Sequence, residues 1–133
     1  MARGSAPVTG RILVVDGANE NLHTVCSTLQ SRGLAVDVVE DGPRALAALE
    51  SGRPDVILLE AGPTGMTGMQ VLDHIRASPQ HAGVPVILIG ERVTDEELLE
   101  GYKFGADYFL SAPITPRRLL YAVGLVLGRE FPE

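Results

Sequence analysis

Two acidic residues, Asp16 and Glu60, each end a short apolar run and are the residues of this chain best placed to do chemistry. Asp16 ends the run RILVVD, and Glu60 ends the run DVILLE. If both runs are parallel strands of one sheet, their carboxyl ends lie at the edge where such sheets bind ligands. Carboxylate oxygens are ligands for a hard cation such as Mg²⁺. Without a cation, their proximity would raise the pKa of one carboxyl group.

Five apolar runs alternate with helical patterns along the whole chain. Strands are expected at Arg11–Asp16, Leu34–Val39, Asp55–Glu60, Pro85–Gly90 and Ala106–Leu110. Helices are expected at Asn19–Arg32, from Gly42-Pro43 to Ser51-Gly52, at Gly68–Ser78, from Thr94 to about Phe104 and from Thr115 to about Gly128. This repetition predicts an α/β fold, a doubly wound five-stranded parallel sheet with helices on both faces. The flavodoxin-like strand order 2-1-3-4-5 suits it best.

Several local signals support these helix boundaries. Thr94 and Glu97 have the spacing of a capping box, in which each side chain bonds the backbone of the other residue. Gly33 stands where a helix end favours a left-handed residue. Leu46 and Leu49 are expected on the buried side of the second helix.

Composition excludes several classes of function. With 133 residues, 45% of them hydrophobic, and a formal charge of −6, the chain suits one compact acidic domain. Neither nucleic acid nor an anionic membrane is an expected partner, because both select basic surfaces. We expect tails at 1–10 and 130–133, one domain at 11–129, and a cytoplasmic location.

Cysteine and histidine give no sign of a metal or cofactor site. The single cysteine, Cys26, excludes an internal disulfide and is expected as a small buried apolar residue. The three histidines, His23, His74 and His81, share no ligand spacing. We therefore expect neither a bound metal nor a cofactor.

Several blocks of the sequence resemble the bacterial response-regulator receiver domain. They are RILVVD, PDVILLE, the turn Gly65-Met66-Thr67-Gly68, PVILIG and GADYFLSAPI, in the family's order and spacing from about residue 11 to 128. The resemblance implies two acids after the first strand and a phosphoacceptor Asp at the end of the third. It also implies Ser or Thr ending the fourth strand, and Lys before the Pro that follows the fifth.

This chain departs from that pattern at most of those positions. The pocket that the resemblance implies consists of Asp16, Gly17, Glu60, Gly90, Ala112 and Pro113. Only the first acid is kept, as Asp16, and the loop after the acceptor position also differs, with Pro63-Thr64. Phosphoryl transfer depends on positioned charges. A glycine in place of an acid removes a metal ligand, and a longer acid displaces another by about 1 Å, which can cost on the order of a hundredfold.

These substitutions predict a pseudo-receiver, a phosphorylation-independent interaction module of bacterial signalling that is not an enzyme. Two alternatives keep a use for the pocket. The domain could still bind Mg²⁺ or accept phosphate weakly through Asp16 and Glu60, or Glu60 could mimic a phosphorylated Asp and lock an active-like state. Arg92 is a candidate partner for that carboxylate. A flavin-like ligand is a poor fit, because the loops after the first and third strands lack a run of Ser, Thr and aromatic residues.

The last helix is more apolar than one buried face requires. Its core stripe is expected to be Leu119, Val123 and Val126, edged by Ala122 and Leu127. Tyr121 and Leu125 lie off that stripe as an exposed i, i+4 pair.

The resemblance implies partner binding, or a homodimer, through the fourth helix, fifth strand and fifth helix. The residues expected on this surface are Tyr102, Lys103, Phe109, Tyr121 and Leu125. Phe109 holds the family's switching aromatic position and is expected to pack in the core or an interface. Arg117 and Arg118 lie in the first turn of the last helix, where the helix dipole disfavours cations. They are expected to be either a solvated pair or contacts for an acidic partner.

Overall fold

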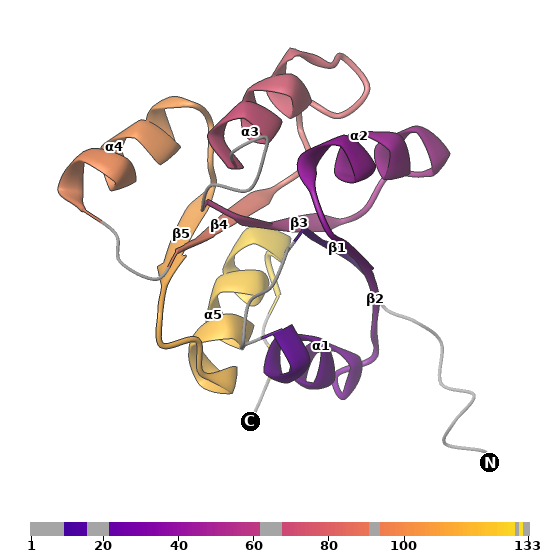
Figure 1. Cartoon of the computed structure of the whole chain (residues 1–133). Coiled ribbons are helices and arrows are strands. Elements are labelled where there is room, and N and C mark those ends of the chain that lie inside the picture. Colours follow the sequence, from indigo (N-terminus) through magenta and orange to yellow (C-terminus); the bar gives the residue numbers. More distant parts are fainter. Residues whose placement is uncertain (1–9, 16–21, 62–67, 91–93, 130, 132–133) are drawn as a thin grey trace.

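A computed structural model describes residues 10–15, 22–61, 68–90, 94–129 and 131, and Figure 1 shows its alternating strands and helices. The strands are β1 (Gly10–Val15), β2 (Leu34–Val39), β3 (Val56–Glu60), β4 (Val86–Gly90) and β5 (Tyr108–Ser111). The helices are α1 (Leu22–Gln30), α2 (Gly42–Ser51), α3 (Gly68–Ala77), α4 (Asp95–Lys103) and α5 (Pro116–Leu127).

The strands form one parallel sheet in the order β2-β1-β3-β4-β5, which confirms the predicted fold. Most element ends fall within two residues of those expected. Strand β5 starts at Tyr108 rather than Ala106, and Asp107 just before it donates its backbone amide to Val86 O at 2.9 Å. Residues 19–21 of the predicted first helix lie outside the described residues.

Helices cover both faces of the sheet, and each face has its own core cluster. On β1, Ile12 and Val14 pack towards α1 and α5, while Leu13 and Val15 pack towards α2 and α3. The five-residue strand β3 is buried at its first four positions. This burial explains why the central strand is a continuous apolar run. In Figure 1, α2, α3 and α4 lie above the sheet and α1 and α5 below it.

The buried stripes differ in detail from the predicted ones. On α2 the buried residues are Gly42, Ala45 and Leu49, while Leu46 only packs partly against the core. Asp41 is the N-cap of α2. Positions 42, 45, 46 and 49 share one face at the i, i+3, i+4 and i+7 spacing, and Leu46 is its partly buried member.

Cys26 and α5 need smaller corrections. Cys26 is half-buried rather than buried. On α5, Leu119, Ala122 and Val123 are buried as predicted, Val126 and Leu127 are half-buried, and Leu120 and Gly124 are also buried. The buried face of α5 is thus wider than one stripe.

The predicted helix ends are confirmed. Glu97 N donates to Thr94 Oγ1 at 3.1 Å and Thr94 N donates to Glu97 Oε1 at 3.2 Å, which completes the capping box. Thr115 caps α5 by accepting a bond from Arg118 N. Gly33 has a φ of 82°, a left-handed value that favours glycine.

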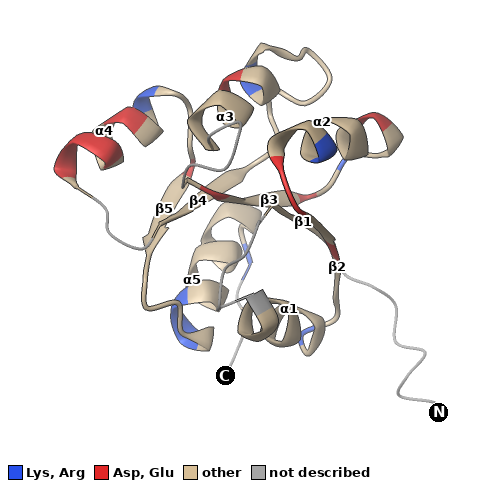
Figure 2. Cartoon of the chain, viewed as in Figure 1, with Lys and Arg blue, Asp and Glu red and all other residues tan. Residues whose placement is uncertain are grey.

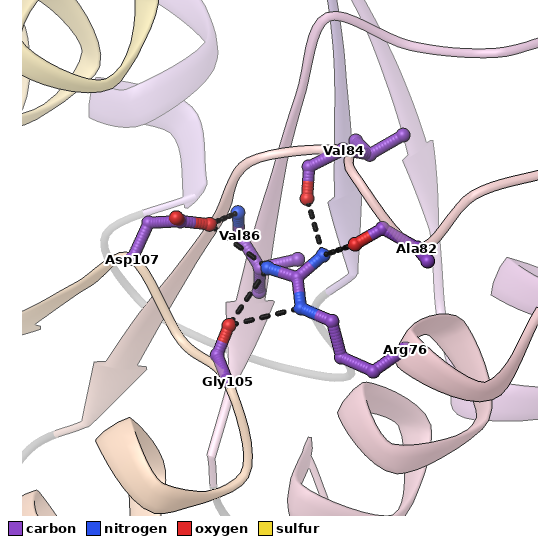
Figure 3. A network of polar contacts seen from close by, with 6 residues as sticks. All are labelled: Arg76, Ala82, Val84, Val86, Gly105 and Asp107. Carbon is purple, nitrogen blue, oxygen red and sulfur yellow. Dashed lines mark hydrogen bonds and ion pairs between the residues drawn. The ribbon is translucent and has the colours of Figure 1, made fainter.

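A single arginine, Arg76 of α3, joins three segments at the amino end of the sheet (Figure 3). Its guanidinium donates bonds of 2.6 to 2.9 Å to the carbonyl oxygens of Ala82, Val84 and Gly105. It also pairs with Asp107 Oδ2 at 2.8 Å, and this oxygen accepts from Val86 N. The Arg76 side chain is only 20% exposed. The network therefore fixes α3 to the starts of β4 and β5.

Among the described residues, no helix has the length and apolar character needed to cross a membrane.

Candidate functional site

Three of the predicted pocket residues lie side by side at the carboxyl end of the sheet. Glu60 ends β3 and pairs in register with Ile89 of β4. Gly90 ends β4 and pairs with Ser111 of β5. Ala112 N donates to Gly90 O at 2.9 Å, which extends the ladder by one residue. The ends of β3, β4 and β5 thus place Glu60, Gly90 and Ala112 along one edge.

The other pocket predictions are placed less completely. Strand β1 ends at Val15, which pairs with Leu59. Asp16 and Gly17 follow it in the chain but lie outside the described residues, as do Arg92 and Pro63-Thr64.

Helix α3 forms one wall beside Glu60. A Cβ atom on Gly68 would lie 2.5 Å from Glu60 O and 2.8 Å from Ala61 Cα. Real Cβ atoms do not approach a carbonyl this closely, so only glycine lets the first residue of α3 meet the end of β3. Glu60 itself is half-buried.

The described part of the edge offers few groups for phosphoryl chemistry. Gly90 carries no hydroxyl and Ala112 no ammonium group, and both residues are half-buried. The Ala112-Pro113 peptide is cis, and Pro113 is exposed. Within the described ranges, no group of three His, Cys, Asp or Glu side chains could hold a metal ion. The described part of this edge contributes one acidic side chain, the carboxylate of Glu60.

Arg118 lies at the rim of this edge, which corrects the prediction of a solvated or partner-binding pair. Its Nη1 donates to Ser111 O at 2.7 Å and to Pro113 O. The side chain is half-buried. Arg118 therefore ties the loop between β5 and α5 to the helix, a role hidden in the sequence because backbone acceptors leave no residue pattern. Arg117 is exposed.

The residues predicted for partner binding lie on both sides of β5. Tyr121 is 62% and Leu125 54% exposed on α5, while Tyr102 is 45% exposed on α4. Lys103 is exposed. Phe109 is half-buried and packs against the core, as expected, and a Cβ atom on the neighbouring Gly101 would lie 3.1 Å from its ring.

Sequence reasoning missed a second exposed apolar group on α4. Leu99 is 70% exposed and Phe104 is 40% exposed. Leu98 and Leu99 are adjacent in the sequence, but at 100° per residue only one of the two side chains can face the sheet. Gly101 was the available signal, because a glycine suits the side of α4 that lies against Leu88 and Phe109. Leu98 is three residues from Gly101 and is half-buried, whereas Leu99 is exposed.

Comparison with known proteins agrees with this geometry. The family model described as response regulator receiver domain matches residues 12–124. The chain belongs to this family. It is a receiver domain of two-component signalling.

Similar proteins support the assignment over most of this receiver. DNA-binding response regulator MtrA of Mycobacterium tuberculosis is 32% identical over 123 residues, which are 92% of this chain and 53% of MtrA. Phosphate regulon transcriptional regulatory protein PhoB of Escherichia coli is 30% identical over 122 residues, with the same coverages. The receiver thus spans about half the length of these relatives. The chemotaxis protein CheY4 of Vibrio cholerae aligns with a TM-score of 0.83 and 30% identity, covering 89% of this chain and 98% of CheY4.

Proposed function

We propose that this receiver is a pseudo-receiver, a cytoplasmic interaction module of two-component signalling that works without phosphorylation and without enzymatic turnover. The observation that carries the proposal is the carboxyl edge of the sheet, where Glu60, Gly90 and Ala112 stand together. These are the positions at which the family resemblance implies Asp, Ser or Thr, and Lys.

The physical argument concerns charge at the transferred group. A phosphoryl group spreads negative charge over its oxygens, and catalysis consists mostly of placing cations and donors against them. Gly90 and Ala112 provide neither kind of group. Glu60 is one methylene longer than Asp, so its oxygens are displaced from the acceptor position.

Partner binding then depends on the outer surface. The exposed pair Tyr121 and Leu125 on α5 and the exposed Tyr102 on α4 lie on the two sides of β5. An aromatic ring with a polar end is favoured in protein interfaces. We propose that a protein partner, or a second copy, binds at the β5 end of the domain, where α4 and α5 flank this strand. We propose no nucleic acid as a partner, because the chain carries a charge of −6.

A second candidate rests on the carboxylate of Glu60 at the acceptor position. Its negative charge would hold an active-like state, or bind Mg²⁺ weakly together with Asp16. In the active-like state, Glu60→Gln removes the charge and weakens partner binding. In the leading proposal, the same change leaves partner binding unaltered.

An NMR titration tests whether the pocket still binds Mg²⁺ or accepts phosphate. Amide signals of the wild-type chain are followed with Mg²⁺, then with beryllofluoride or acetyl phosphate. A positive control carries Gly17→Asp, Glu60→Asp, Gly90→Ser and Ala112→Lys, which restore the family's groups. We expect saturable shifts in the restored variant only. Saturable shifts of Glu60 and Gly90 in the wild type, spreading to Phe109, would show that the domain still switches.

A further inference from the structure

The outward side of α4 has a shallow, open hollow with a mixed apolar and charged lining. The hollow is about 550 Å³, and it is lined by Glu96, Leu99, Glu100, Lys103 and Phe104. We call these five residues the outer α4 face. The opposite side of α4 meets the sheet at Gly101, where a Cβ atom would lie 2.9 Å from Leu88 Cδ1.

Acidic side chains flank the apolar part of this face. Figure 2 shows α4 as the helix richest in acidic residues. Glu97 serves the capping box, and Glu96 lies in the first turn, where the helix dipole favours an acid. Glu100 lies beyond that turn and one helical turn from Glu96, so the two carboxylates repel each other. In the described part of the chain, neither carboxylate takes part in a hydrogen bond or ion pair.

Two features of this face do not stabilise the isolated domain. Leu99 is the most exposed large apolar side chain among the described residues, at 70%. The repulsion between Glu96 and Glu100 beside it offsets part of what the helix dipole contributes at Glu96. Both features become favourable when a surface with apolar groups and cations covers them, because apolar area is removed from water and the carboxylates are paired.

We propose that the outer α4 face binds a Lys- or Arg-rich amphipathic segment of a partner protein. The proposal rests on the proposed function as an interaction module and specifies the chemistry of its partner. Apolar side chains of the segment cover Leu99 and Phe104. Two cations one helical turn apart pair with Glu96 and Glu100, and an acidic group lies near Lys103. A second copy is a poor occupant, because two chains of charge −6 repel each other.

The test uses a synthetic amphipathic helix of Lys and Leu as the probe, and a Glu-Leu helix of the same length as its counterpart. Binding to the full chain is measured by amide NMR shifts and by calorimetry. Leu99→Ala and the double change Glu96→Gln with Glu100→Gln remove the two contact types. The matched controls are Glu50→Gln, an exposed acid on α2, and Val38→Ala, an exposed apolar residue on β2.

We expect the Lys-Leu helix to shift the amides from Glu96 to Phe104 and the Glu-Leu helix to leave them unchanged. Leu99→Ala and the double glutamine variant should each weaken binding about tenfold, a change of about 1.4 kcal/mol. Glu50→Gln and Val38→Ala should leave binding within about twofold, while added salt weakens it.

The inference is overturned by no binding of the Lys-Leu helix, by equal weakening by Glu50→Gln, or by self-association through α4 that Leu99→Ala abolishes. The proposed function fails separately, through saturable Mg²⁺ and beryllofluoride shifts at Glu60. Loss of binding on Leu125→Ala with Leu99→Ala silent would place the partner on α5, which rejects the inference but keeps the interaction module.

Discussion

The two ends of the parallel sheet differ in the polar side chains that they carry. At the amino end, Arg76 and Asp107 bond to one another and to the backbone of the segments that enter β4 and β5. At the carboxyl end, Gly90 and Ala112 follow the same two strands and carry no polar side chain. The amino end thus serves the fold, while the described part of the carboxyl end offers the carboxylate of Glu60 beside two residues without polar side chains. Substitutions at each end should therefore differ in their effect on stability.

The largest effect is expected at Arg76. Arg76→Met removes a partly buried charge-assisted network and leaves carbonyl oxygens unpaired, so the free energy of unfolding should fall by about 2–4 kcal/mol. Urea unfolding measures it. The matched control is Arg44→Met, which breaks an exposed i, i+4 pair with Glu40 and should cost about 0.5 kcal/mol. Equal losses would contradict the contrast between the ends.

The next effect concerns the wall beside Glu60. Gly68→Ala forces a Cβ atom against the end of β3, so α3 must shift, at a cost of about 1–3 kcal/mol. Gly52→Ala is the control, because nothing lies within 4 Å of a Cβ atom there. Thermal unfolding of the pair should show a loss only for Gly68→Ala. A neutral Gly68→Ala would mean that the carboxyl end is looser than described.

A smaller loss is expected at the rim of the carboxyl end. Arg118→Met removes the donor to Ser111 O and Pro113 O, at a cost of about 1–2 kcal/mol in unfolding free energy. Arg11→Met breaks an exposed pair with Asp37 and should cost less than about 1 kcal/mol. If denaturant unfolding gives the same value for both, the half-buried position of Arg118 contributes nothing.

The smallest effect is expected at the edge itself. Ala112→Lys adds back the family's cation at a half-buried position beside an exposed Pro113, and the unfolding free energy should change by less than about 0.5 kcal/mol. Chemical denaturation beside the wild type measures this. A loss above about 2 kcal/mol would show that the edge is packed too tightly to have kept a working lysine.

The fold was predictable because parallel strands covered on both faces must be continuous apolar runs, and helices between them must carry one apolar stripe. The runs ending at Glu60 and Gly90 therefore placed both residues at one edge. The networks of Arg76 and Arg118 were not predictable, because most of their acceptors are backbone carbonyls, and those of Arg76 are up to 29 residues away. Leu46 packs against the core as predicted, but it is only partly buried, which the helix pattern alone does not determine.

The sequence separation within the Arg76 network has a consequence for folding kinetics. Arg76 and Asp107 are 31 residues apart, and they meet only when β4, α4 and β5 have closed on the sheet. Because closing so long a loop costs entropy, we expect these contacts to form after the transition state for folding. Arg76 should therefore lower the unfolding rate without raising the folding rate. Its replacement should shorten the lifetime of the folded domain.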